Sequence, residues 1–207
     1  MTPQEIQEHY ILLGTRLPRN IFTELTQNLT HHFHNAAVER GWWTNLTTGE
    51  PLKRNVGEMF ALMGTELNEA VQADEDADEH LPDFRNELIE IADLHIRLFD
   101  MSGKFFPYLP AKIGNRLETL YGFGPLESYV SLTGIQGLYI PLFNAFEHYR
   151  KGKIEEASNE LARLFTDSFC FYPPRILGVA VAAKYEYNLR RADHTPQARL
   201  ADGGKKI

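Results

Sequence analysis

Four acidic side chains stand in two pairs along the chain, each pair three residues apart. Glu66 and Glu69 form the first pair, and Glu90 and Asp93 form the second. A step of three residues on an α-helix places both side chains on one face, with their Cβ atoms about 5 to 6 Å apart. Carboxylates this close repel one another, more strongly when partly buried, and a cation relieves the repulsion. Ligand sets made only of oxygen suit Mg²⁺, with Mn²⁺ as a possible substitute.

The segments that carry these pairs have the apolar spacing of helices. One helix is predicted at about 55–73, and another from about Leu81-Pro82-Asp83 to Met101. The acidic run between them, Ala73 to Glu79, is expected to form a short solvated loop. A short loop favours antiparallel packing, which would bring the four carboxylates together. Two solvated acidic helix faces remain the alternative, because glutamate is common on exposed helix surfaces.

The rest of the chain also has helical periodicity, so the fold class predicted is all-α. No segment shows sustained strand alternation, a P-loop or a glycine-rich dinucleotide turn. The 207 residues fit one domain. We expect a metal-binding core at about 19–101 and 175–191, a helical elaboration at about 104–173 and a flexible tail at 192–207. The further helices are predicted at about 19–40, 111–121, 134–150, 153–170 and 175–191.

Several polar and aromatic side chains could bind a phosphorylated substrate. Lys184, Asn188 and Arg191 fall on one side of the last helix, where they could reach phosphate oxygens together. Lys53 is a further candidate for phosphate binding. Trp43, with its neighbour Trp42, could stack on a base, although a core or subunit contact explains such residues equally well. A solvated helix face is likewise the alternative for the C-terminal set.

The residues around the acidic pairs resemble the signature of a known superfamily. Gly64-Thr65-Glu66-Leu67-Asn68-Glu69-Ala70, then His80-Leu81-Pro82, then Glu90-Ile91-Ala92-Asp93 resemble the MazG-type, all-α nucleotide pyrophosphohydrolases, which include the dimeric dUTPases. The family pattern is Glu-x-x-Glu, a spacer, then Glu-x-x-Asp, and here twenty residues separate Glu69 from Glu90.

Three flanking segments extend the resemblance. Gly41-Trp42-Trp43 resembles the Gly-aromatic-Trp of phage-type members, and Lys184 to Arg191 resembles their Lys-x-x-x-Asn-x-x-Arg helix. The tail from Gly203 to Lys206 resembles their terminal His-Gly-Gly-Lys. In this chain Ala192 stands where the family often has proline, and eight residues lie between His194 and Gly203. A match of His194 and Lys205 to the family tail therefore stays open.

The resemblance implies an activity and a ligand set. A nucleoside triphosphate would be hydrolysed between its α and β phosphates to the monophosphate and pyrophosphate. Glu66, Glu69, Glu90 and Asp93 would be the catalytic and metal-binding residues, holding Mg²⁺. Base specificity, the number of ions and the carboxylate acting as general base are not implied.

Composition restricts the partners and the compartment expected for this chemistry. The formal net charge is −7, which argues against a nucleic-acid polymer as partner. The chain has no apolar stretch long enough to cross a membrane, its N-terminus lacks signal-peptide features, and Cys170 is its single cysteine. We therefore expect a cytoplasmic protein without a membrane partner, and its wide apolar helix faces favour a homo-oligomer.

Two other functional classes were weighed. A ferritin-like di-iron protein needs Glu-x-x-His pairs, and no glutamate stands three residues before any histidine of this chain. His95 is expected to be a packing residue, and the cluster of His31, His32 and His34 a surface feature. A non-catalytic helical interaction or assembly protein with solvated acidic faces remains the alternative function.

Overall fold

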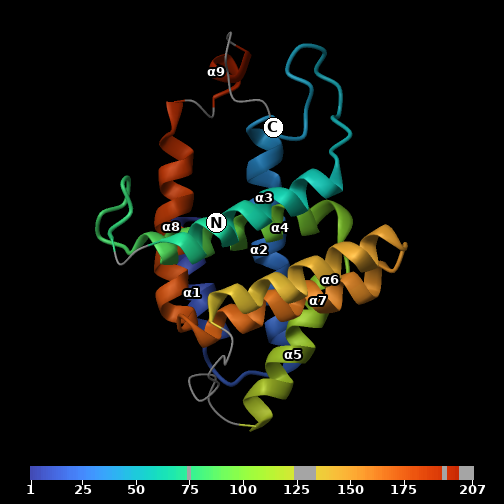
Figure 1. Cartoon of the computed structure of the whole chain (residues 1–207), viewed down its shortest axis with the longest axis vertical. Helices are drawn as coiled ribbons and strands as arrows, with labels where there is room; N and C mark the ends of the chain where they lie inside the picture. The colour runs from blue at the N-terminus through green and yellow to red at the C-terminus, as the bar shows by residue number, and fades with distance from the viewer. Residues whose placement is uncertain (74–75, 124–133, 193–194, 201–207) are drawn as a thin grey trace.

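The computed structural model describes residues 1–73, 76–123, 134–192 and 195–200, and the described residues form an all-α fold, as predicted. Among them there is no β-strand, only two isolated bridges. The long helices cross at different angles around one core (Figure 1). The helices are α1 (Pro3–Leu13), α2 (Arg19–Glu39), α3 (Val56–Gln72), α4 (Asn86–Phe105), α5 (Leu109–Phe123), α6 (Tyr139–Arg150), α7 (Ile154–Asp167), α8 (Pro174–Arg190) and α9 (Pro196–Leu200).

Helix α1 was not predicted, although the sequence carries a start signal for it. Thr2 and Glu5 form a capping box, in which Thr2 Oγ1 accepts from the Glu5 N–H at 3.2 Å and Glu5 accepts from the Thr2 N–H at 2.6 Å. The buried face of α1 packs against α8. Gly178 permits this close approach, because a Cβ at that position would lie 2.4 Å from Tyr10 Cβ.

Helix α4 lies at the centre of the fold and packs against α2, α3 and α8. It begins at Asn86, later than the predicted start, because Asp78 organises a turn instead. The carboxylate of Asp78 accepts from the backbone N–H groups of His80 and Leu81 at 2.9 and 2.7 Å. Asp78 is thereby buried, so the expectation that the whole acidic run is solvated is wrong at this residue. Asp74 and Glu75 lie outside the described residues.

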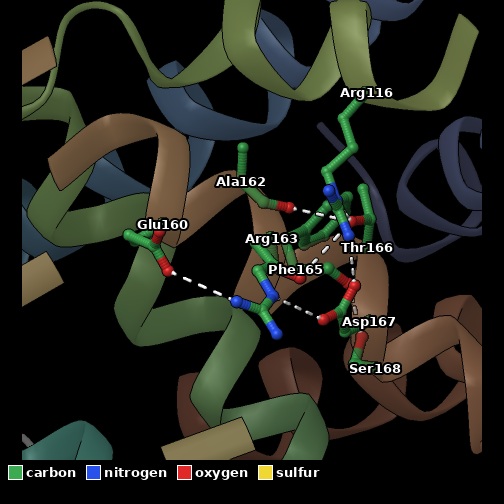
Figure 2. Close-up of polar contacts among 8 residues, drawn as sticks. All are labelled: Arg116, Glu160, Ala162, Arg163, Phe165, Thr166, Asp167 and Ser168. Atoms are coloured by element: carbon green, nitrogen blue, oxygen red, sulfur yellow. Dashed lines mark hydrogen bonds and ion pairs between the residues drawn. The ribbon is translucent and has the colours of Figure 1, made fainter. Parts of the chain in front are cut away.

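The segment predicted as an elaboration, about 104–173, contains α5 and an antiparallel pair, α6 and α7, which lie side by side across the lower half of the molecule (Figure 1). They join at Gly152, between the helices predicted at about 134–150 and 153–170, and this glycine has a φ of 73°. A polar cluster fixes α7 to α5: Arg116 donates to Thr166 and to Asp167, at 2.5 and 2.6 Å (Figure 2). Arg163 donates to the same Asp167 carboxylate at 3.2 Å.

A buried polar network joins α1, α4 and the 3₁₀ turn after α7. His95 lies between the Tyr10 hydroxyl at Nδ1 and Ser168 Oγ at Nε2, both at 2.9 Å. Ser168 Oγ donates to the Phe165 carbonyl at 2.6 Å, so it accepts from the imidazole, and Nδ1 accepts from Tyr10. All the polar atoms of the network have partners, and His95 is the packing residue that was predicted.

Candidate active site

Three of the four predicted carboxylates meet between α3 and α4. Glu66, Glu69 and Glu90 each offer an oxygen, and these atoms all lie within 4.8 Å of one another. Helices α3 and α4 run antiparallel, as the short connection predicted (Figure 1). Glu66 and Glu90 are buried, whereas Glu69 is exposed at the edge of the cluster. Since carboxylate oxygens are the ligands that Mg²⁺ and Mn²⁺ prefer, the donor set fits such an ion.

The electrostatics of the cluster show uncompensated negative charge. Burial, a hydrogen bond to Glu66 and the charges of Glu66 and Asp93 raise the pKa of Glu90 to about 8, against the opposing effect of Lys184. Burial also raises the pKa of Glu66, against the opposing effect of the Arg97 guanidinium. The pair of Glu66 and Glu90 therefore holds a proton more readily than free carboxyls do when no cation is bound. A divalent ion would replace that proton as the counter-charge.

The fourth predicted carboxylate, Asp93, is held by helix α8. Lys184 Nζ lies 3.2 Å from one oxygen of Asp93, and the Asn188 amide donates to the other at 3.2 Å. Burial alone would lower the pKa of Lys184, but Asp93 and Glu90 outweigh it and the net pKa is raised. Asp93 is near enough to raise the pKa values of Glu66 and Glu90. Two of the predicted substrate-binding residues thus contact a predicted metal ligand.

Arg97 is a functional candidate that the sequence reading missed. Its Nε donates to Glu66 Oε1 at 2.6 Å, which makes an ion pair between α4 and α3. Position 97 is four residues after Asp93, so the helical spacing was available as a signal. When Glu66, Glu69, Glu90 and Asp93 are all ionised, Arg97 and Lys184 balance two of the four charges. The two negative charges that remain would be neutralised by one Mg²⁺ ion.

A cavity of about 210 Å³ adjoins the cluster and shares Asp93 and Arg97 with it. One part of its wall is apolar or aromatic and another part is basic, which is the usual mixture at small-molecule sites. Arg97 comes from α4, whereas the other arginines lie just after α2, just before α3 and just after α8, and no spacing rule groups them in the sequence. The lining includes Phe33, Ala36, Leu62, Ile96, Trp42, Tyr185, Asn188, Arg40, Arg54, Arg97, Arg191, Asp93 and Asp100.

The two tryptophans occupy different environments. Trp43 is 7% exposed and its Nε1 donates to Asp100 at 2.8 Å. Its ring packs against His34 and Phe105, which agrees with the core contact that was the alternative to base stacking for this residue. Trp42 lines the cavity, and the guanidinium of Arg199 from α9 lies 3.7 Å from its ring centroid. The predicted flexible tail therefore contains a helix that packs beside the cavity.

The remaining predicted residues are spread around this site. Arg191 lines the cavity, with its guanidinium 5.7 Å from the ring centroid of Tyr187. Lys53 is exposed in the connector before α3 and is not part of the cavity wall. His194 and Lys205 lie outside the described residues, so their proposed match to a family tail is not placed.

None of the helices in the described ranges is both long and apolar enough to cross a membrane. Comparison with protein families, curated proteins and solved structures found no match in any of the three. The function must therefore be argued from the site itself.

Proposed function

We propose that the protein is a Mg²⁺-dependent nucleoside triphosphate pyrophosphohydrolase, which hydrolyses a (d)NTP to the (d)NMP and pyrophosphate. One observation supports this most strongly: carboxylates from two sequence motifs on antiparallel helices lie within 4.8 Å of one another. They do so beside a cavity with arginine and aromatic walls. This arrangement agrees with the MazG-type resemblance of the same motifs, and it offers both a cation site and a place for an organic ligand.

In this proposal the residues of the chain divide the work. Glu66, Glu69 and Glu90 would hold the ion, which supplies charge neutralisation at the phosphates and an activated water. Lys184 and Asn188 fix the orientation of Asp93 at the edge of the cluster. A carboxylate held in this way can accept a proton or complete the ligand set. The cavity would receive the nucleoside, with the phosphates directed toward α3 and α4.

A test begins with a panel of canonical and modified NTPs and dNTPs, assayed for pyrophosphate release with Mg²⁺ or Mn²⁺. We expect release from at least one substrate, and a loss of about 100-fold or more in Glu90→Gln. Glu87→Gln is a matched control, since Glu87 precedes Glu90 by three residues on α4 and lies outside the cluster. In the wild type the Tyr172 hydroxyl donates to Glu87 at 2.5 Å, and a glutamine at position 87 can still accept this bond.

The same experiment separates the alternative function. A non-catalytic interaction protein would release no pyrophosphate from any nucleotide, and Glu90→Gln would match the wild type. Metal binding gives an independent readout: Mg²⁺ or Mn²⁺ should raise the melting temperature of the wild type and of Glu87→Gln, but not of Glu69→Gln. No shift in the wild type, together with an inert panel, would rule the enzyme out.

A further inference from the structure

Arg97 connects the carboxylate cluster to the cavity. Its Nε donates to Glu66 at 2.6 Å, and the same side chain forms part of the cavity wall. It stands one helical turn beyond Asp93 on α4, on the face that carries the carboxylates. Glu66 is 5% exposed and faces this one guanidinium across the gap between the helices. A single cation thus touches a proposed metal ligand and borders the proposed substrate cavity.

Most of the hydrogen-bonding capacity of Arg97 is unused. A guanidinium has five N–H donors, and within the described ranges the bond from Nε to Glu66 is the one hydrogen bond that Arg97 makes. Its side chain is 36% exposed, so the Nη groups can be reached from the cavity. Arg40, another arginine of the wall, is more engaged, since it donates to the carbonyls of Asn188 and Leu189 near the end of α8.

A divalent cation and Arg97 compete for the same carboxylate. A metal ion bound by Glu66 would stand a few ångströms from the guanidinium, and like charges at that distance repel. The Arg97 guanidinium is held by Glu66 alone among the described residues, and it stands at the end of a long side chain. Turning away from Glu66 therefore costs little beyond that ion pair. The cavity beside it is where the phosphates of a substrate would pass toward the cluster.

We infer that Arg97 is a substrate-contacting residue that exchanges partners: it neutralises Glu66 until a divalent cation binds there, and then donates to a phosphate of the nucleotide. This rests on the proposed function. Arg97 then offsets one negative charge of the buried cluster before the metal arrives, and its bidentate donors suit a phosphate afterwards. Metal binding and substrate binding are coupled through this one side chain.

The exchange predicts effects of opposite sign in Arg97→Met. Loss of the competing cation should tighten Mn²⁺ binding in the absence of nucleotide, by about threefold or more. Loss of the phosphate contact should raise KM by about tenfold. A purely structural ion pair predicts a different result, since loosening the α3 and α4 contact would weaken both. Arg97→Lys keeps the charge and should stay close to wild type in Mn²⁺ affinity while recovering part of KM.

The experiment measures the Mn²⁺ dissociation constant by calorimetry without nucleotide, and KM and kcat with the best substrate of the panel. Arg116→Met is the control, because Arg116 is as exposed as Arg97 and makes an ion pair with Asp167 between α5 and α7 (Figure 2), helices that carry none of the cluster carboxylates. It should leave both quantities unchanged. Should Arg97→Met fail to fold, Arg97→Gln carries the same test with a shorter neutral side chain.

The outcomes are distinct. Tighter Mn²⁺ binding with a raised KM supports the exchange, and unchanged or weaker Mn²⁺ binding in Arg97→Met overturns it. If wild type binds Mn²⁺ and releases pyrophosphate while Arg97→Met matches it in both, the inference alone fails. If wild type does neither, the proposed function fails, and the inference fails with it.

Discussion

The buried imidazole of His95 should make the protein sensitive to mild acid. Burial lowers the pKa of His95 from 6.5 to about 3. The folded state thus binds fewer protons than the unfolded state between these values. The contribution of neutral, buried His95 to the free energy of unfolding is fully present above pH 6.5 and is lost as the pH falls toward 3. Integrating between pH 8 and pH 5 with these two values gives a loss of about 2 kcal/mol from this one residue.

The hydrogen-bond network indicates a variant that isolates this effect. In His95→Gln the amide oxygen can accept from the Tyr10 hydroxyl and the amide N–H can donate to Ser168, so both bonds can persist without a titrating group. Urea unfolding followed by far-UV circular dichroism at pH 8 and pH 5 gives the two free energies for each protein. Other groups that titrate in this range are common to both proteins and cancel in the comparison.

Wild type should lose about 2 kcal/mol more than His95→Gln over this interval. Equal losses in the two proteins would refute the argument, because they would mean that His95 takes up no extra proton on unfolding. A constant offset between the proteins at both pH values is a separate quantity. It measures how well glutamine fits between Tyr10 and Phe165 in a fully buried site.

Two further predictions concern packing. Gly178→Ala should destabilise the fold by about 1 to 3 kcal/mol in the same urea titrations, because the new methyl would lie 2.4 Å from Tyr10 Cβ. Gly64→Ala is the control, since its methyl meets nothing within 4 Å, and it should be neutral or up to about 1 kcal/mol more stable. Equal effects of the two substitutions would contradict the close approach of α1 and α8. The expected homo-oligomer should be visible by light scattering, and Phe143→Glu on the exposed apolar face of α6, where Ile140 and Phe143 are 52% and 59% exposed, should shift it toward monomer; an unchanged mass would exclude this face as the contact.

The helices were predictable wherever one face is apolar over several turns. The predicted ranges 19–40, 55–73 and 175–191 agree with α2, α3 and α8 to within about two residues. Helix α1 was missed because it is short, and because the segment with its capping signal was considered only for the features of a signal peptide. The start of α4 was misplaced because Pro82 resembles a first-turn proline. In the structure that proline lies in a turn organised by the Asp78 side chain, which propensity does not reveal.

The candidate site was predictable in part, for a related reason. Glu66, Glu69 and Glu90 could be found because spacing of three on a helix is local information, and a short loop restricts how two helices pack. The pairing of Asp93 with Lys184 spans some ninety residues of sequence and follows from the way α8 meets α4. The cavity arginines have the same origin in tertiary packing. The sequence also left open whether Trp43 packs in the core, because the fold decides which aromatic of an adjacent pair is buried.

The positions of the tryptophans have a practical consequence. The chain contains two tryptophans; Trp42 lines the cavity, and Trp43 donates to Asp100 in the cavity wall. The tryptophan fluorescence of the protein, excited selectively over its nine tyrosines, therefore originates entirely at this one place. The charged Arg199 group over Trp42 makes that emission sensitive to displacement of α9. Ligand titrations can thus be followed without a label, whereas fluorescence-detected unfolding would report on the opening of this corner before the loss of the whole fold.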